Sequence, residues 1–255
     1  MKIRTLVIIL FAFAGSILLH AESYSSKETF SRTGAFNPTG KIVFENTNGD
    51  VNIATWDKNE ILIEGEKSAK TDEELKLIEL TIELKEASAA IKVRLPKRSS
   101  GLFSSNNIRA AVRFKITVPA TVSLEKINVV NGSVDIKGMR GSVTVESVNG
   151  RIRAHDLGGN VDLGAVNGEI DASLAVLSTG QKLSFHTVNG SITAALPADS
   201  GIELRASVVN GSIDCDFPVN VHGKVSGKRI SGKVGDGRAS LNAESVNGGI
   251  RIRKI

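Results

Sequence analysis

The chain has 255 residues, and its 32 Lys and Arg against 27 Asp and Glu give a formal net charge of +5. This positive excess is too small to indicate a nucleic-acid partner, and the single cysteine excludes an internal disulfide. With 25 glycines and only 4% aromatic residues, the composition favours a long, thin core of aliphatic side chains.

The first 21 residues have the layout of a secretory signal peptide. Lys2 and Arg4 precede an apolar run from Leu6 to Leu19, and a polar stretch follows Ala21. We therefore expect cleavage after Ala21 and export to the periplasm or the cell surface. An uncleaved anchor is the alternative, and only that form would associate with a membrane.

Residues 22–119 are expected to form a strand-rich but less regular part that leads into the repeats and caps them. Thr71 and Glu74 form a capping box that predicts one short helix, and Lys97 to Asn107 reads as an exposed loop. Segments of alternating polarity predict strands at Lys41–Glu45, Asp50–Ala54, Glu60–Glu64, Leu80–Lys85, Ala90–Leu95 and Val112–Val118.

Residues 120–255 contain six copies of Val-Asn-Gly, and a degenerate seventh, Thr47-Asn48-Gly49, lies upstream. The asparagines are separated by 18, 18, 22, 21 and 37 residues, so the last gap is about two repeats long. Recurrence at a near-constant spacing is typical of a stacked repeat protein. The copies begin at Val130, Val148, Val166, Val188, Val209 and Val246.

Each 18-residue repeat contains a shorter period of nine residues. β-Branched residues recur every nine positions, a second apolar residue follows two positions later, and a polar residue lies between them, as half-buried strands require. We expect the first two sets to face inward and the polar set to face water. The inward sets are Val134, Val143, Ile152, Val161 and Ile170, and Ile136, Val145, Ala154, Leu163 and Ala172; the polar set is Asp135, Thr144, Arg153, Asp162 and Asp171.

Asn-Gly between alternating strands is also the signal for a tight β-hairpin. A hairpin would pair Val148 with Arg151 and Val166 with Glu169, placing an apolar group beside a polar one each time. A solenoid corner would let Val148 point inward with Ile152, and we favour the corner. Asparagine amides would then hydrogen-bond between rungs and glycine would take the required backbone angle. The predicted structural corner residues are Asn131, Gly132, Asn149, Gly150, Asn167, Gly168, Asn189, Gly190, Asn210, Gly211, Asn247 and Gly248.

These patterns predict an all-β fold: a single-stranded β-solenoid, or parallel β-helix, over residues 120–255, after a signal peptide at 1–21 and the irregular part at 22–119. The final segment, Arg251-Ile252-Arg253-Lys254-Ile255, is expected to place charge on the last sheet edge and so to block self-assembly.

Several motifs of this chain occur in the same order as in a known bacterial family. Besides the serial Val-Asn-Gly copies, they comprise Thr47-Asn48-Gly49-Asp50-Val51, Trp56-Asp57-Lys58-Asn59-Glu60, Asp72-Glu73-Glu74-Leu75 and the strand from Phe114 to Pro119. The chain resembles the bacterial putative-adhesin family of domains of unknown function, which is similar to auto-transporter adhesin head domains. The resemblance covers essentially the whole mature chain. It implies an exported β-solenoid of the cell envelope and no catalytic residues.

Candidate catalytic groups are few. His155, His186 and His222 share no metal-ligand spacing, and we interpret His155 and His186 as solvated surface residues. Paired carboxylates across a groove would allow cleavage of a polysaccharide, and the outward aspartates are the candidates. Stacking is expected to place Arg153 between two of them and to neutralise both. The candidate aspartates are Asp135, Asp162, Asp171 and Asp214.

Two stretches mimic known ligand loops. Gly227 to Val234 matches the phosphate-loop spacing, but Val234 replaces the Ser or Thr that holds magnesium. Gly158-Gly159-Asn160-Val161-Asp162 is a single, incomplete match to a calcium-binding roll. Cys215 is expected to be a small core residue. Basic residues available for an acidic partner are Lys224, Lys228, Arg229, Lys233 and Arg238, with Arg251, Arg253 and Lys254 at the end.

We therefore predict an exported, non-enzymatic envelope protein that presents a structural or adhesin-like interaction surface and needs no cofactor or metal. Its expected partners are envelope glycans or other envelope proteins, not nucleic acid. The alternatives are a polysaccharide-active enzyme that uses carboxylates on an outer face, and a self-assembling protein.

Overall fold

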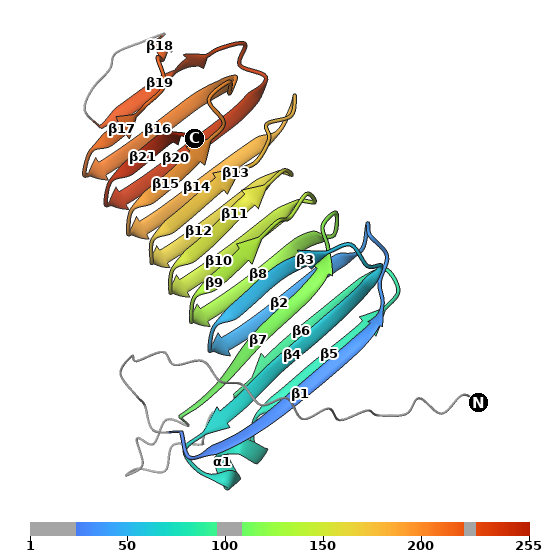
Figure 1. The fold of residues 1–255 in the computed structure, drawn as a ribbon. Coiled ribbons are helices and arrows are strands. Elements are labelled where there is room, and N and C mark those ends of the chain that lie inside the picture. Colours follow the sequence, from blue (N-terminus) through green and yellow to red (C-terminus); the bar gives the residue numbers. More distant parts are fainter. Residues whose placement is uncertain (1–23, 96–108, 222–227) are drawn as a thin grey trace.

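The computed structural model describes residues 24–95, 109–221 and 228–255 (Figure 1). The predicted signal peptide and the predicted loop from Lys97 to Asn107 lie outside these ranges. Within them the protein is nearly all-β, with two large sheets and one short helix, α1 (Asp72–Lys76). No helix among these residues is long and apolar enough to span a bilayer.

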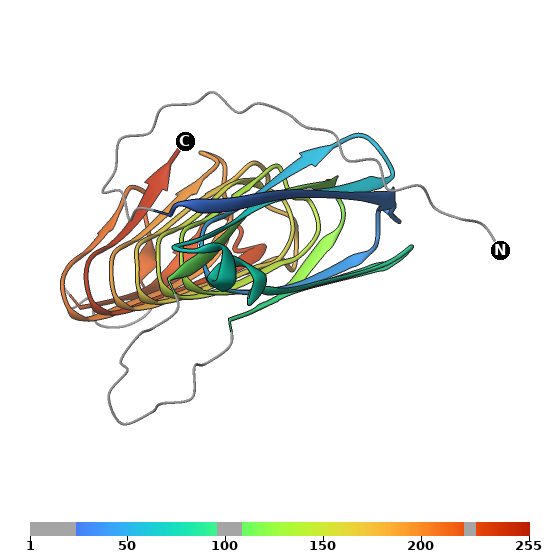
Figure 2. The same cartoon turned by 90° about the horizontal axis from the view of Figure 1, so that it is seen from below.

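The two sheets form the two layers of the molecule (Figure 2). Sheet A contains, in spatial order, β1 (Ser26–Ala35), β4 (Glu60–Ala69), β7 (Ala110–Pro119), β3 (Val51–Trp56), β9 (Val134–Lys137), β11 (Ile152–Leu157), β13 (Ile170–Leu174), β15 (Ile192–Leu196), β21 (Ile250–Lys254) and β17 (Ile213–Cys215). Sheet B contains β18 (Asn220–Val221), β19 (Arg229–Val234), β16 (Ile202–Asn210), β20 (Ala239–Asn247), β14 (Lys182–Asn189), β12 (Val161–Asn167), β10 (Val143–Asn149), β8 (Ser123–Asn131), β2 (Lys41–Asn48), β6 (Ser88–Arg94) and β5 (Glu79–Lys85).

Each Asn-Gly step carries the chain from one sheet to the other. The strand before it belongs to sheet B and the strand after it to sheet A, and each pairs in parallel with its counterparts in the neighbouring repeats. The hairpin interpretation is therefore wrong, and the arrangement is β-solenoid-like. We call one sheet B strand, its corner and the following sheet A strand a rung.

The inner positions build the core. All ten residues predicted to face inward from the nine-residue period are buried, and none is more than 2% exposed. The intervening polar residues remain accessible to water. The nine-residue inner register is thus confirmed.

The valines of the Val-Asn-Gly copies contradict the prediction. Val148 and Val166 are 40% and 42% exposed, and so do not point inward with Ile152 and Ile170. The buried position belongs to the preceding residue, Ser147 in the first of these rungs. The chain leaves sheet B at this point, so the valine and the asparagine both lie on the outside of the bend.

The last rung is not at the end of the stack. Strands β20 and β21 lie between the β14–β15 rung and the β16–β17 rung (Figure 1), so the prediction that the final segment blocks the last edge is wrong. One edge of β16 is occupied by antiparallel β19, which leaves only its other edge for β20. The stack therefore ends in β17 on one sheet and in β19 and β18 on the other.

At the opposite end, the degenerate copy joins the stack. Asn48 pairs with Asn131, so β2 and β3 form a rung in register with the repeats. Beyond it, antiparallel strands β1 and β5 are the outermost strands of their sheets. Thr71 accepts a hydrogen bond from the amide of Glu74 at 3.2 Å, which confirms the predicted N-cap of α1.

Candidate interaction surface

The asparagines of the seven corners form a continuous hydrogen-bonded ladder. In each step the side-chain Nδ2 of one asparagine donates to the Oδ1 of its neighbour at 2.8 to 2.9 Å, and Asn48 ends the ladder by donating to the carbonyl of Ala110 at 3.0 Å. Each amide keeps a second N–H that is free to meet a ligand. The ladder runs Asn48, Asn131, Asn149, Asn167, Asn189, Asn247 and Asn210.

The corner glycines allow close stacking of the backbone. A Cβ on Gly150, Gly168 or Gly190 would lie 2.0 Å from the carbonyl oxygen of the glycine in the adjacent rung. None of these three has a positive φ, so the requirement here is the space above a carbonyl rather than an unusual backbone angle. At Gly49, with φ +113°, and at Gly248, with φ +150°, the backbone angle also favours glycine.

Replacing Asn167 with aspartate should break the ladder in a pH-dependent way. The variant loses the donor that reaches Asn149 Oδ1 at 2.9 Å and places a carboxylate there instead, so we expect a loss of about 1 to 3 kcal/mol at neutral pH. Protonation below about pH 4 restores a donor. Stability relative to the unchanged protein should therefore recover as the pH falls.

Denaturant unfolding at pH 7 and pH 3.5 measures this effect, with Asn59→Asp as the control because Asn59 is exposed and lies outside the ladder. A pH-independent loss at Asn167 would mean that the ladder hydrogen bond is not what the substitution removes.

The exposed valines lie beside this ladder. Register pairing of the flanking residues places one valine on each of six adjacent rungs, and each is between 39% and 56% exposed. We call this row the valine stripe. In spatial order it contains Val130, Val148, Val166, Val188, Val246 and Val209.

A charged row crosses the outer face of sheet A. Arg153 lies between Asp135 and Asp171, as predicted, and its Nη2 donates to Asp135 Oδ2 at 3.2 Å. The pKa of Arg153 is raised above its ordinary value, mainly by the hydrogen bond to Asp135 and next by the negative charge of that carboxylate. The row runs Glu64, Lys115, Asn52, Asp135, Arg153, Asp171, Thr193, Arg251 and Asp214.

This row does not contain all four candidate aspartates. Asp162 belongs to β12 in sheet B, so it does not lie with Asp135, Asp171 and Asp214 on sheet A. A nine-residue step changes sheet, and only residues 18 apart share a face. Because Arg153 separates Asp135 from Asp171, the row is a surface charge ladder and not a pair of free carboxylates.

His155 and His186 lie on the surface, as predicted. His155 Nε2 is 3.8 Å from Asp171 Oδ2, and His186 Nε2 is 3.6 Å from Glu146 Oε1. The His186 pair spans the intervening strand above Gly164, where a Cβ would lie 2.3 Å from His186 Nε2. Such exposed pairs contribute little to stability.

The two ligand-loop mimics have structural roles. Residues Arg229–Val234 form strand β19 and no helix follows them, and in the Gly158–Asp162 stretch a Cβ on Gly159 would lie 2.2 Å from the carbonyl oxygen of Gly141. No group of three potential metal ligands occurs among the described residues. His222, Lys224 and Gly227 lie outside them.

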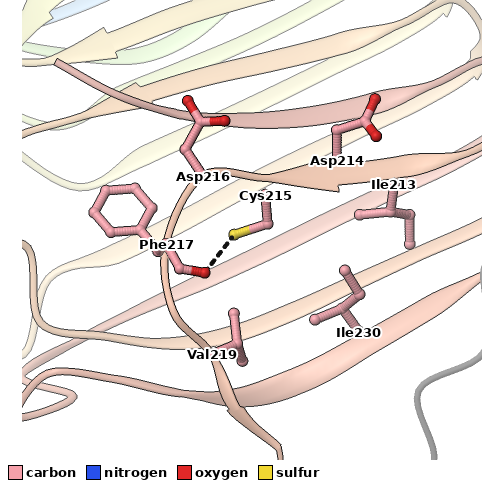
Figure 3. A pocket seen from close by; sticks show the side chains of 7 residues that line it. All are labelled: Ile213, Asp214, Cys215, Asp216, Phe217, Val219 and Ile230. Carbon is pink, nitrogen blue, oxygen red and sulfur yellow. Dashed lines mark hydrogen bonds between the residues drawn. The ribbon is translucent and has the colours of Figure 1, made fainter.

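A hollow of about 510 Å³ lies at the end of the stack, against β17 and β19 (Figure 3). Asp214 and Asp216 point away from its apolar side, where Ile213 and Ile230 lie. Cys215 is half-buried there rather than fully buried, and burial raises the pKa of its thiol, which lowers its reactivity. The hollow therefore lacks convergent reactive groups.

The valine stripe is the surface feature that sequence reasoning missed. Part of the signal lies in the residue before the valine, which is small in four of the six repeats, at Ser147, Ala165, Thr187 and Ser245; in the other two, Val129 and Val208 occupy the buried position. A small residue fits the inside of a tight corner, and its successor must then point outward.

Comparison with known proteins finds one matching family and several similar solved structures. Residues 139–253 match the family described as Toastrack DUF4097, and no curated protein matches the chain. A crystal structure named as a putative cell adhesion protein from Clostridium sporogenes has 18% identity and a TM-score of 0.54, over 89% of this chain and 100% of that one. At this identity the likeness shows the fold alone.

Two further crystal structures are less similar. A putative adhesin from Bacteroides fragilis has 14% identity and a TM-score of 0.31, over 89% of this chain and 98% of that one. A putative adhesin from Parabacteroides merdae has 9% identity and a TM-score of 0.37, over 91% and 97%.

Proposed function

We propose that this protein is exported and acts in the cell envelope as a non-catalytic, adhesin-like interaction surface. Residues 1–21 serve as a cleaved signal peptide, residues 22–119 lead into and cap the stack, and residues 120–255 form a single-stranded solenoid. The partners are envelope glycans or other envelope proteins.

One observation carries this proposal. The outer surface presents unbroken rows of side chains across many rungs, namely the asparagine ladder and the charged row of sheet A, whereas the described residues contain no metal-ligand cluster. Long rows of repeated groups suit an extended partner. The name of the Clostridium sporogenes protein, which shares the fold, also supports an adhesive role.

Fractionation of cells that produce the full chain tests the proposed cellular location. We expect the protein in an envelope or periplasmic fraction, with Glu22 as its first residue. Retention in the cytoplasm with an intact leader would overturn export. A glycan array probed with residues 22–255 then tests the surface, and Arg153→Gln should weaken any acidic-glycan signal if the charged row takes part.

Assays on a panel of polysaccharides test the enzymatic alternative. We expect no hydrolysis by the unchanged protein, because Arg153 separates Asp135 from Asp171. A hydrolytic activity that disappears in Asp171→Asn but survives in Asp162→Asn, on the other sheet, would replace the interaction role with catalysis.

A further inference from the structure

The valine stripe is a concentration of exposed apolar surface. The described residues contain nine exposed large hydrophobic side chains, and six of them are the stripe valines. Single exposed hydrophobics are ordinary, but a contiguous apolar row marks an interaction site. With parallel strands about 4.8 Å apart, the six valines span about 24 Å.

The stripe follows the straight edge of the molecule. The Asn-Gly corners form an even stack of tight bends along the left of the repeats in Figure 1, and the longer connections, such as residues 175–181, project from the opposite edge. Among the residues that the structure describes, the long connection between β13 and β14 therefore lies on the edge opposite the stripe.

Polar rows border the stripe on both sides. One border is the asparagine ladder, and the other is formed by the residues two positions before each valine. An apolar centre with a polar rim is the usual anatomy of a protein interface. The six rungs that carry a stripe valine supply eighteen positions in these three rows, three on each rung, close to the roughly 20 to 30 residues per partner of a standard interface. The second border runs Asn128, Glu146, Gly164, His186, Glu244 and Ser207; Gly164, which has no side chain, is covered by the side chains of Glu146 and His186.

A second copy of the chain fits this surface. A second copy presents six valines at the same rung spacing and over the same length, so each valine of one stripe can meet a valine of the other. Side chains on two such rows can interlock over their full length.

The residues on the two sides of the valine stripe favour one relative orientation of the two copies. In an antiparallel pair, Val148 faces Val246 and therefore Glu146 faces Glu244, which repel each other. In a parallel pair, with the two-fold axis along the stack, each valine faces its own counterpart. Asn149 and Asn247 of one copy then face Glu146 and Glu244 of the other, and their second N–H groups can donate to these carboxylates.

We propose that two copies associate side by side through the valine stripe, in the same direction and in register. This dimer does not depend on the adhesin-like role, and glycan binding measured on a monomeric variant reports on that role separately.

Analytical ultracentrifugation of residues 22–255 over a concentration series tests the association. We expect a dimer that is lost in the double variant Val166→Lys, Val188→Lys. The control is Val176→Lys, because Val176 is 52% exposed but lies between β13 and β14, away from the stripe; it should stay dimeric. Circular dichroism checks that both variants fold. A monomeric unchanged protein, or a stripe variant that stays dimeric, would overturn the proposal.

Disulfide trapping tests the direction. In a Cys215→Ala background, Val166→Cys should form a covalent dimer on oxidation, because residue 166 faces itself in the parallel pair. If neither Val166→Cys nor Val188→Cys links alone but a mixture of the two does, the copies are antiparallel and the proposed register is wrong.

Discussion

Replacing Gly168 with alanine is expected to destabilise the protein by about 3 kcal/mol. The new Cβ would lie 2.0 Å from the carbonyl oxygen of Gly150. Neither partner can move freely, because the amide of Gly168 donates to Asn189 and the amide of Gly150 donates to Asn167, both at 3.1 Å. Separating the two corners would therefore weaken hydrogen bonds on both.

The midpoint of urea unfolding measures this loss. Gly249→Ala is the matched control, because that glycine lies one position past a corner and its Cβ would meet only Ser212 O, at an ordinary 3.6 Å. Its effect should stay within about 0.5 kcal/mol. Equal midpoints for the two variants would show that the corners can separate without cost.

The inner register could be predicted because burial depends on local pattern. Val143, Val145 and their equivalents nine residues on must alternate with polar residues if each strand is to cover one side of the core. The corner interpretation followed from the same pattern, since a hairpin would have set Val148 beside Arg151. Such deductions need only a few neighbouring residues.

The side on which each Val-Asn-Gly valine lies could not be predicted from alternation alone. Alternation holds within a strand, and it fails at the corner, where Val148 and Asn149 both face outward. There the valine has no inner position to fill, because Ser147 already occupies it.

The order of the rungs could not be predicted either. Every rung offers the same alternation of buried positions and the same Asn-Gly corner, so the local pattern does not decide whether β14 pairs with β16 or with β20. The choice is made by a long-range event, the return of β19 along β16. Of the four candidate aspartates, only Asp162 was misplaced, for a related reason: a nine-residue step preserves burial but changes the sheet.

This rung order has a measurable consequence at the last residues of the chain. In a stack wound in sequence order, the final strand would be an edge, and a truncated side chain there would cost little. Instead, Ile252 on β21 lies between Ala194 and Cys215 on the two neighbouring strands and is fully buried.

Ile252→Ala should therefore cost about 2 to 5 kcal/mol, as expected for a cavity in a core, although it is only three residues from Ile255. Ile255→Ala removes the same atoms from a side chain that is 64% exposed, and it should change stability by no more than about 0.5 kcal/mol. Thermal or urea unfolding of the pair separates the two topologies. A small effect at Ile252 would indicate that the last rung lies at the end of the stack. A large effect is expected if β21 lies between β15 and β17.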